Sequence, residues 1–366
     1  MKSKVLILAE VPGIAKRLGA TVAPVFSAFL NGPKRTSCKA EGYTSAAFAI
    51  LNLKFRRSSN HVNPLRISIV EYLNTSPLVR GFTHGPLCGK YQLSFTVPSQ
   101  CAEALRSGDV DVAIIPAIEY QRIPDLVILP NLSIASKKSV RSLLLVSRKP
   151  IHEVKRIALD RSSRSTQALT RILCEKRWRI TPEFFEAAPD LPAMLQHADA
   201  ALLIGDPALR LSIAVAPKVQ RGSSGEMVGP LTAAGLSGSG CLFIYDIVEK
   251  WRAMTGLPAV LAVWAARRDA AAPELVQDFQ DSLAIGLRQL DAIAAEAAAE
   301  MNLPANELRT YLAENIDYHL DEENLQGLTR YYSFAAQYGL ISGKLRPIEL
   351  AAQPSERVLS RVVADR

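Results

Sequence analysis

Residues 66–77 read RISIVEYLNTSP, and this segment indicates a β-strand that leads directly into a helix. Apolar and polar side chains alternate in its first half, as on a strand, and Ser76 with Pro77 is typical of a helix start. Residues 92–97 and 110–115 have the composition of two further strands, with a helix between them that ends at a glycine. Short links between elements in this order predict a parallel sheet and hence an α/β fold.

A second series of the same kind begins at residue 156. Residues 156–160 and 200–204 are predicted strands, and helices are predicted over residues 165–178 and from Pro207 onward. Two α/β series in one chain predict two lobes with a cleft between them. Ligands of open α/β sheets bind outside the carboxyl ends of the strands, so we expect the ligand in this cleft.

The pattern divides the body of the chain into three parts. Residues 65–148 are predicted to form the first part of lobe 1, and residues 149–258 to form lobe 2. Within lobe 2, residues 211–240 contain six glycines in Ser-rich surroundings, which is typical of a flexible surface loop. Residues 259–366 are predicted to return to the lobes with a crossing strand and C-terminal helices. These helices are predicted over residues 273–299, 305–314 and 322–338.

The excess positive charge of the chain belongs to its first 64 residues. The whole chain has a formal net charge of +8, from 43 Lys and Arg against 35 Asp and Glu. Residues 1–64 hold ten of the basic residues and two of the acidic ones, which leaves 33 of each for the rest. The basic character therefore gives no support to a nucleic-acid partner for the body, and we expect none.

Residues 1–64 do not fit a secretory signal. An apolar run over residues 5–9 follows two lysines, but Glu10 interrupts it and Lys16 soon ends it. The strand pattern begins only after this segment, and valine codons can serve as starts, so we expect the native protein to begin near Val62. The basic N-terminal extension is then disordered or absent from the working protein.

Cysteine and histidine usage indicates neither a disulfide framework nor a metal site. The five cysteines are scattered without a C-x-x-C pair, which favours a reducing compartment, and we expect the protein in the cytoplasm. The five histidines lack ligand spacing, and no Gly-rich phosphate-binding motif follows a strand. No apolar stretch reaches the ~18 residues of a membrane span. We therefore expect no metal, no cofactor and no membrane span.

Three polar turns lie at predicted strand-to-helix junctions, over residues 72–76, 161–166 and 205–206. Residues 161–166 read RSSRST at the start of a helix, where free N–H groups, hydroxyls and the helix dipole favour an anion. Capping needs only one Ser or Thr, so this excess of donors favours anion binding. Asn74 and Thr75 add uncharged donors at the facing turn, although a local Asx or Ser/Thr turn is the better interpretation on spacing alone.

The charged residues near these turns have two interpretations each. Lys137 and Lys138 are expected on a solvated face, whereas Arg141 precedes a strand and either stays at the surface or reaches the cleft. Asp206 either caps its own helix, which is the safer interpretation, or receives a ligand hydroxyl. Composition and spacing thus predict a two-lobed α/β protein that binds a small anion, a description that fits a solute receptor and an enzyme equally well.

Several segments resemble the chorismate dehydratases of menaquinone biosynthesis, the enzymes of the futalosine route. They are YLNTSPL (72–78), DVDVAIIP (109–116), IEY (118–120), ALDRSSRST (158–166), LIGDPAL (203–209) and TGLPAV (255–260). The resemblance spans about residues 65–340. The segment at 109–116 is by itself generic to this fold, whereas the YLNT turn together with the SSR turn is much more specific.

The resemblance implies the two-lobed α/β fold of type II periplasmic binding proteins, with the ligand cleft between the lobes. It also implies removal of water from chorismate to give 3-[(1-carboxyvinyl)oxy]benzoate, without a cofactor or a metal. In this substrate-assisted elimination, the enolpyruvyl carboxylate of the substrate can reach the ring proton beside the ether oxygen. The resemblance places Asn74 against the substrate, where we expect it to orient the substrate and stabilise developing charge rather than act as a base.

The resemblance and the polar turns together define the expected site. Asn74 is the expected catalytic residue of a carbon–oxygen lyase, more narrowly a hydro-lyase. The residues expected to bind substrate are Tyr72, Thr75, Arg141, Ser142, Ser162, Ser163, Arg164, Ser165, Thr166 and Asp206. Chorismate is the expected partner, and the sequence leaves the oligomeric state open.

Two departures from the family pattern bear on the chemistry. Position 71 is Glu where the family often has Ser, which leaves a protein base open, and Ala117 stands where Ser is common. Two alternatives remain: a non-catalytic solute-binding protein of this fold, and the sister pathway enzyme, 1,4-dihydroxy-6-naphthoate synthase. The first requires export, and the second has an opening turn of Ser-Pro-Cys-Pro-Asn character, unlike YLNTSP.

Overall fold

The computed structural model describes residues 64–222, 226–237 and 240–353. They belong to one compact unit, Asn63–Arg366. The predicted basic extension and the predicted start near Val62 lie outside the described residues. None of the described helices has the length and the apolar character that crossing a membrane requires.

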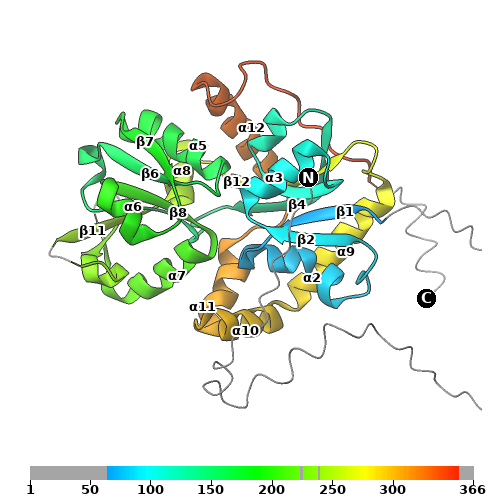
Figure 1. Cartoon of the computed structure of the whole chain (residues 1–366), viewed down its shortest axis with the longest axis horizontal. Helices are drawn as coiled ribbons and strands as arrows, with labels where there is room; N and C mark the ends of the chain where they lie inside the picture. The colour runs from blue at the N-terminus through cyan, green and yellow to red at the C-terminus, as the bar shows by residue number, and fades with distance from the viewer. Residues whose placement is uncertain (1–63, 223–225, 238–239, 354–366) are drawn as a thin grey trace, which may run out of the picture. The chain divides into compact units, whose positions relative to one another are not determined.

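A five-stranded sheet forms the core of lobe 1, in the order β2-β1-β3-β12-β4 (Figure 1). Its strands are β1 (Arg66–Val70), β2 (Gln92–Thr96), β3 (Val112–Pro116), β4 (Leu126–Ser136) and β12 (Ala259–Arg267). β1 pairs in parallel with β2 and β3, as the alternating strand and helix pattern predicts. β12 pairs antiparallel with β3 and β4, so the sheet is mixed. β3 is buried along its whole length, in agreement with its unbroken apolar sequence.

A seven-stranded sheet forms the core of lobe 2, in the order β7-β6-β8-β5-β11-β10-β9. Its strands are β5 (Leu143–Ser147), β6 (Arg156–Asp160), β7 (Glu183–Ala187), β8 (Ala200–Ile204), β9 (Gln220–Arg221), β10 (Met227–Pro230) and β11 (Cys241–Asp246). β6 is parallel to β7 and β8, whereas β5 is antiparallel to β8 and β11. The second sheet therefore begins at Leu143 and not at the predicted residue 149, because the fully buried β5 joins its two halves.

Helices accompany both sheets (Figure 1). The α-helices are α2 (Ser76–His84), α3 (Pro98–Ser107), α4 (Glu119–Arg122), α5 (Ser165–Ile172), α6 (Leu191–His197), α7 (Gly205–Val215), α8 (Ile247–Thr255), α9 (Pro273–Arg288), α10 (Leu290–Met301), α11 (Ala305–Thr310) and α12 (Glu322–Gln337). Short turns of other helix types are η1 (Leu73–Thr75), η2 (Ile151–Glu153), η3 (Leu173–Trp178), η4 (Ala216–Lys218), η5 (Leu231–Ala234) and η6 (Tyr311–Asn315). η1 precedes α2, η3 continues α5 and η6 continues α11.

The predicted helix over residues 273–299 is two helices in the structure. α9 ends at Arg288 because Gln289, with φ −113° and ψ 20°, leaves the helical conformation. α9 packs closely against α2 near its end, where a Cβ on Gly286 would lie 1.9 Å from the Pro77 carbonyl oxygen. The Gln289 side chain also accepts a hydrogen bond from Arg80 Nε at 2.7 Å. Contacts with α2 thus stabilise the break between α9 and α10. Such tertiary contacts do not alter the hydrophobic periodicity of the sequence, so the periodicity does not predict the break.

Residues 211–240 contain more regular structure than the predicted flexible loop. α7 continues to Val215, and β9 and β10 extend the sheet of lobe 2 as antiparallel strands. Leu231 and Leu236 are buried in the core of this lobe. Residues 223–225 and 238–239 lie outside the described part of the chain.

Candidate functional site

A small cavity lies between the two sheets, at the carboxyl ends of β1, β3 and β8. The last residues of these strands, Val70, Pro116 and Ile204, all line it. The other lining residues are Tyr72, Asn74, Thr75, Pro98, Ile114, Ile134, Leu143, Ser163, Ser165, Thr166, Gly205, Leu261 and Ala262. The cavity therefore lies where the sequence predicts the ligand.

The lining of this cavity contains no charged side chain. Its polar groups come from two walls, one at residues 72–75 of lobe 1 and one at residues 163–166 of lobe 2. The rest of the lining is apolar apart from the glycine. Hydrogen bonds are stronger in such an environment than in water, so uncharged donors there are effective partners for an anion.

The wall of lobe 1 is the turn from Tyr72 to Thr75, which contains η1. The Leu73 N–H donates to both carboxylate oxygens of Asp206, at 3.1 and 3.3 Å, so a residue of lobe 2 caps this turn. Asp206 does not cap its own helix, the interpretation favoured from the sequence, because it lies inside the first turn of α7, whose N-cap is Ile204. Burial raises the pKa of Asp206 to about 6, although the bond from Leu73 and the charge of Arg210 oppose the shift.

Tyr72 closes the cavity against Gly205. Gly205 has a φ of +65°, and a Cβ at this position would lie 2.6 Å from Cε2 of the Tyr72 ring. Only glycine meets both conditions, the left-handed backbone and the close ring. The hydroxyls of Tyr72 and Ser162 lie 3.3 Å apart. Burial raises the pKa of Tyr72 to about 12, so this side chain is a neutral phenol at physiological pH.

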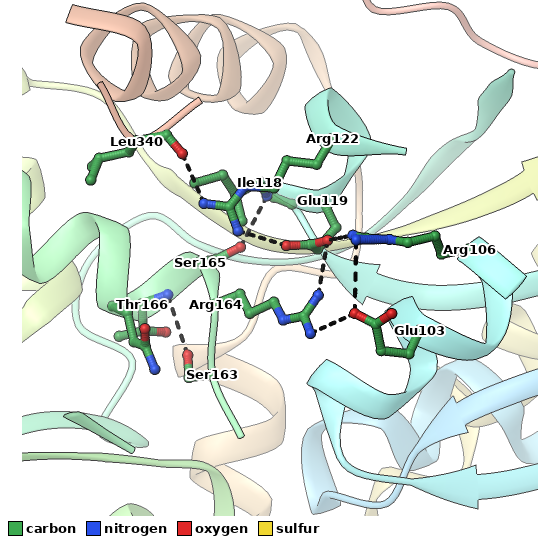
Figure 2. Close-up of polar contacts among 12 residues, drawn as sticks. Glu103, Arg106, Ile118, Glu119, Arg122, Ser163, Arg164, Ser165, Thr166 and Leu340 are labelled. Atoms are coloured by element: carbon green, nitrogen blue, oxygen red, sulfur yellow. Dashed lines mark hydrogen bonds and ion pairs between the residues drawn. The ribbon is translucent and has the colours of Figure 1, made fainter. Parts of the chain in front are cut away.

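The wall of lobe 2 is the turn that opens α5 (Figure 2). Ser163 Oγ accepts a hydrogen bond from the Thr166 N–H at 3.3 Å, and Ser165 Oγ accepts one from the Ile118 N–H at 3.1 Å. A hydroxyl that accepts one hydrogen bond still has its own proton to donate. The positive end of the α5 dipole lies at the same place. This wall thus presents uncharged donors of the kind that binds anions.

The structure brings six of the eleven predicted site residues to the lining of the cavity, and the other five do not line it. The six that line it are Tyr72, Asn74, Thr75, Ser163, Ser165 and Thr166. The five that do not line it are Arg141, Ser142, Ser162, Arg164 and Asp206. Each of these five has partners within the protein, and Asp206, as described, holds the facing turn.

The two predicted arginines point to carboxylates of the protein. Arg164 Nη2 donates to Glu103 Oε1 at 2.7 Å, and its Nη1 lies 3.1 Å from Glu119 Oε2 (Figure 2). Arg141 Nη2 donates to Glu307 Oε2 at 2.7 Å. These ion pairs take up part of the donor capacity of each guanidinium and direct it to carboxylates of the protein.

The two predicted serines that do not line the cavity also have partners. Ser162 donates from both its N–H and its hydroxyl to Asp160 Oδ1, at 2.9 and 2.6 Å. Burial raises the pKa of Asp160, and the two bonds from Ser162 oppose this. Ser142 Oγ accepts a hydrogen bond from the Tyr311 hydroxyl at 2.9 Å.

Tyr311 contacts predicted site residues without lining the cavity, and the sequence analysis does not predict it. It is fully buried, which raises its pKa, and its hydroxyl lies close to the Asn74 side chain as well as to Ser142. Its position on η6 is 169 residues from Ser142 along the chain. No local pattern distinguishes Tyr311 from the other tyrosines of the chain as a second phenol at this site.

Glu71, the exposed carboxylate that precedes the YLNT turn, lines an adjoining cavity that shares Val70, Tyr72 and Thr75 with the cavity between the lobes. This adjoining cavity has a volume of about 310 Å³ and is also lined by Arg80, His84 and Glu296, whereas Glu71 is absent from the lining of the cavity between the lobes. No group of three or more His, Cys, Asp or Glu that could hold a metal occurs within the described ranges.

Comparison with known proteins places these features in context. A family model for menaquinone biosynthesis matches residues 65–337. A chorismate dehydratase of Thermus thermophilus is 29% identical over 282 residues, which are 76% of this chain and 97% of that protein. Among solved structures, protein AF1704 of Archaeoglobus fulgidus matches with a TM-score of 0.58 at 18% identity, covering 76% of this chain and 98% of its own.

A solved ABC transporter structure from Parabacteroides distasonis has a TM-score of 0.50 at 14% identity and covers 80% of this chain and 99% of its own. At these sequence identities, the similarity to solved structures shows the fold alone. The predicted two-lobed α/β fold of the periplasmic-binding-protein type is confirmed, with one sheet in each lobe.

Proposed function

This chain belongs to the menaquinone-biosynthesis family, and on that premise we propose that it removes one molecule of water from chorismate. The product is 3-[(1-carboxyvinyl)oxy]benzoate, and the enzyme is a carbon–oxygen lyase, more narrowly a hydro-lyase. The similarity to the Thermus thermophilus chorismate dehydratase supports this proposal. In the structure, one observation carries it: uncharged donors of both lobes face one cavity that no charged side chain lines.

The substrate is a dianion, and the two walls offer it different donors. We assign the hydroxyls of Ser163, Ser165 and Thr166, with the N-terminus of α5, to a substrate carboxylate. Asn74 and Thr75 then face the ring from lobe 1. The apolar lining, such as Ile134 and Leu261, suits the ring itself.

The elimination needs two bonds to break. The C–H bond beside the ether oxygen gives up its proton, and its electron pair spreads into the ring carboxylate. The neighbouring C–OH bond then breaks, the departing hydroxide takes up the proton that was removed from the ring and leaves as water, and the ring becomes aromatic. Aromatisation drives the reaction, so the protein needs chiefly to hold the reactive conformer and to stabilise the developing charge with donors that are already in place.

The base in this proposal is the enolpyruvyl carboxylate of the substrate. No carboxylate of the described residues lines the cavity, since Asp206 accepts from Leu73 and Asp160 accepts from Ser162. Glu71 lines only the adjoining cavity of about 310 Å³. Asn74 has no acidic or basic group, and its amide can donate to oxygen atoms that gain charge in the transition state.

The test is incubation of the purified chain with chorismate, followed by mass spectrometry of the small molecules. The proposal predicts loss of one water and the ultraviolet absorption of a substituted benzoate. Saturable binding of chorismate without turnover would favour the solute-binding alternative. Turnover of a cyclic futalosine derivative instead would favour the sister enzyme. Neither alternative has a specific observation in its favour, and the cytoplasmic location stays a prediction.

A further inference from the structure

Glu119, the first residue of α4, is a fully buried carboxylate among three arginines (Figure 2). Arg122 Nη1 donates to its Oε1 at 2.8 Å, and Arg164 Nη1 lies 3.1 Å from its Oε2. Arg106 Nη2 also donates to Oε2. Burying a carboxylate is costly unless it is paired and hydrogen-bonded, and these guanidinium groups meet that need.

One of these arginines comes from the other lobe. Arg106 on α3 and Arg122 on α4 belong to lobe 1, as does Glu103 on α3. Arg164 immediately precedes α5 of lobe 2. Its guanidinium lies between Glu103, at 2.7 Å, and Glu119, at 3.1 Å, so both of its charged partners are on lobe 1. The ion pairs of Arg164 therefore join the lobes at the edge of the anion-binding turn.

Uncharged contacts hold the same turn from behind. The Ile118 N–H donates to Ser165 Oγ at 3.1 Å, and the Tyr331 hydroxyl of α12 donates to the Ser165 carbonyl at 3.0 Å. The Ser99 N–H donates to the Ser162 carbonyl at 3.1 Å. The back of the turn is thus bound to lobe 1, while its front lines the cavity.

We propose that Glu119 is a positioning residue that, through Arg164, orients the Ser163–Thr166 turn for a substrate carboxylate. This inference rests on the proposed function of the cavity. It also accounts for two separate motifs of the sequence, IEY at 118–120 and SSRST at 162–166, which meet at this point. The donors of this turn bind a carboxylate only when they point at it, so a shift of the turn weakens substrate binding measurably.

Positioning and direct binding by Arg164 predict opposite results when Glu119 loses its charge. If Arg164 itself bound the substrate, Glu119→Gln would release its guanidinium and tighten binding of a dianion. If Glu119 acts through Arg164, the same change loosens the turn and weakens binding. The turn binds the carboxylate in the ground state and the transition state alike, so the effect falls on KM more than on kcat.

The experiment compares steady-state kinetics with chorismate for the full chain and three variants, Glu119→Gln, Arg164→Gln and the double variant. We expect each single variant to raise KM by about tenfold with kcat changed less than about threefold. The double variant is expected to be no worse than either single one, because the two residues act as one unit. A KM that is unchanged or lower in Glu119→Gln would overturn the inference.

A matched control is the ion pair of Arg252 on α8 with Glu323 on α12, at 2.8 Å, which also connects elements of the two lobes but does not touch the turn. Arg252→Gln is expected to leave KM within about twofold of the parent value. If Glu119→Gln does not fold, Glu103→Gln removes the more exposed partner of Arg164, and a KM equal to that of the parent then overturns the inference. Failure of the parent chain to convert chorismate refutes the proposed function instead.

Discussion

Asn74 brings an amide to a cavity whose lining has no charge. Its Oδ1 accepts a hydrogen bond from Thr75 Oγ1 at 3.4 Å, and the Tyr311 hydroxyl lies close to the same side chain. With the oxygen engaged, the amide NH₂ group is the part that can turn to the substrate. Asn74 thus acts through the dipole of its amide. The orientation of this amide depends on one neighbour in sequence, Thr75, and on one distant residue, Tyr311.

Replacing Asn74 by Ala is expected to lower kcat with chorismate about a hundredfold, as loss of one charge-stabilising donor does in other enzymes. The side chain is only half-buried, so the free energy of unfolding should change by less than about 1 kcal/mol. Steady-state kinetics and urea unfolding measure the two quantities. A variant with normal turnover would remove Asn74 from the mechanism.

Asp206 is a carboxylate that folding makes harder to ionise. Burial raises its pKa to about 6 from the ordinary value of 3.8. Between these values the unfolded chain holds the ionised group while the folded chain keeps the proton, so ionisation favours unfolding. The stability that Asp206 contributes is therefore present below about pH 4 and is lost as the pH rises through about 6.

Comparison with Asp206→Asn isolates this effect, because Asn has nearly the same shape and does not ionise. We expect the free energy of unfolding of the parent chain, minus that of the variant, to fall as the pH rises from about 4 to about 7. Urea unfolding at a series of pH values measures this difference. A difference that is constant over the range would contradict the raised pKa.

At the scale of elements, one buried carboxylate joins the N-terminus of α8 to the chain crossing between the lobes. Asp246 Oδ1 accepts from the N–H groups of Val248 and Glu249, both at 3.0 Å. Its Oδ2 accepts from the N–H groups of Val140 and Arg141, at 3.0 and 2.7 Å. The cap of one helix thereby also holds the segment that leads into β5.

Asp246→Ala is expected to lower the free energy of unfolding by about 3 kcal/mol, because it leaves four N–H groups without this acceptor in a buried place. The matched control is Asp190→Ala at α6, where an exposed Asp accepts from the Ala193 N–H at 3.1 Å. That change should cost about 1 kcal/mol, as an ordinary N-cap does. Equal losses in the two variants would contradict the special role of Asp246.

At the scale of the whole molecule, the cavity between the lobes is smaller than its proposed ligand. Its volume is about 60 Å³, whereas pockets for small molecules have volumes of roughly 300–1,000 Å³. Polar contacts join the lobes around this cavity, among them those of Leu73 with Asp206, Tyr72 with Ser162 and Arg164 with Glu119. We therefore expect the lobes to move apart when chorismate enters, which breaks contacts of this kind.

Small-angle X-ray scattering can detect this movement. We expect the radius of gyration of the free chain in solution to fall when a slowly converted chorismate analogue is added. Gly205→Ala offers a second comparison, because its new Cβ meets the Tyr72 ring and prevents full closure, so its radius should change less. An identical radius with and without the analogue in the parent chain would argue against opening and closing.

Much of the fold follows from local signals. Alternation over residues 66–70 and the apolar run of 112–115 predict β1 and β3, and the Ser-rich turn at 162–166 predicts donors at the start of α5. β12 and β5 have equally apolar sequences, but their antiparallel partners are set by pairing with distant strands. For the same reason, no local sequence signal predicts the break after α9, because contacts with α2 stabilise it.

The sequence by itself determined the two α/β series, the polar strand-to-helix turns and, through its motifs, the family, because side-chain period and turn chemistry depend on near neighbours. Only the tertiary structure decided which donors face the cavity. Arg164 and Arg141 turn to Glu119 and Glu307, and Asp206 turns to Leu73, because folding brings these distant partners within hydrogen-bond distance. A polar side chain bonds to the partner that the fold places nearest, and spacing along the chain does not reveal that partner.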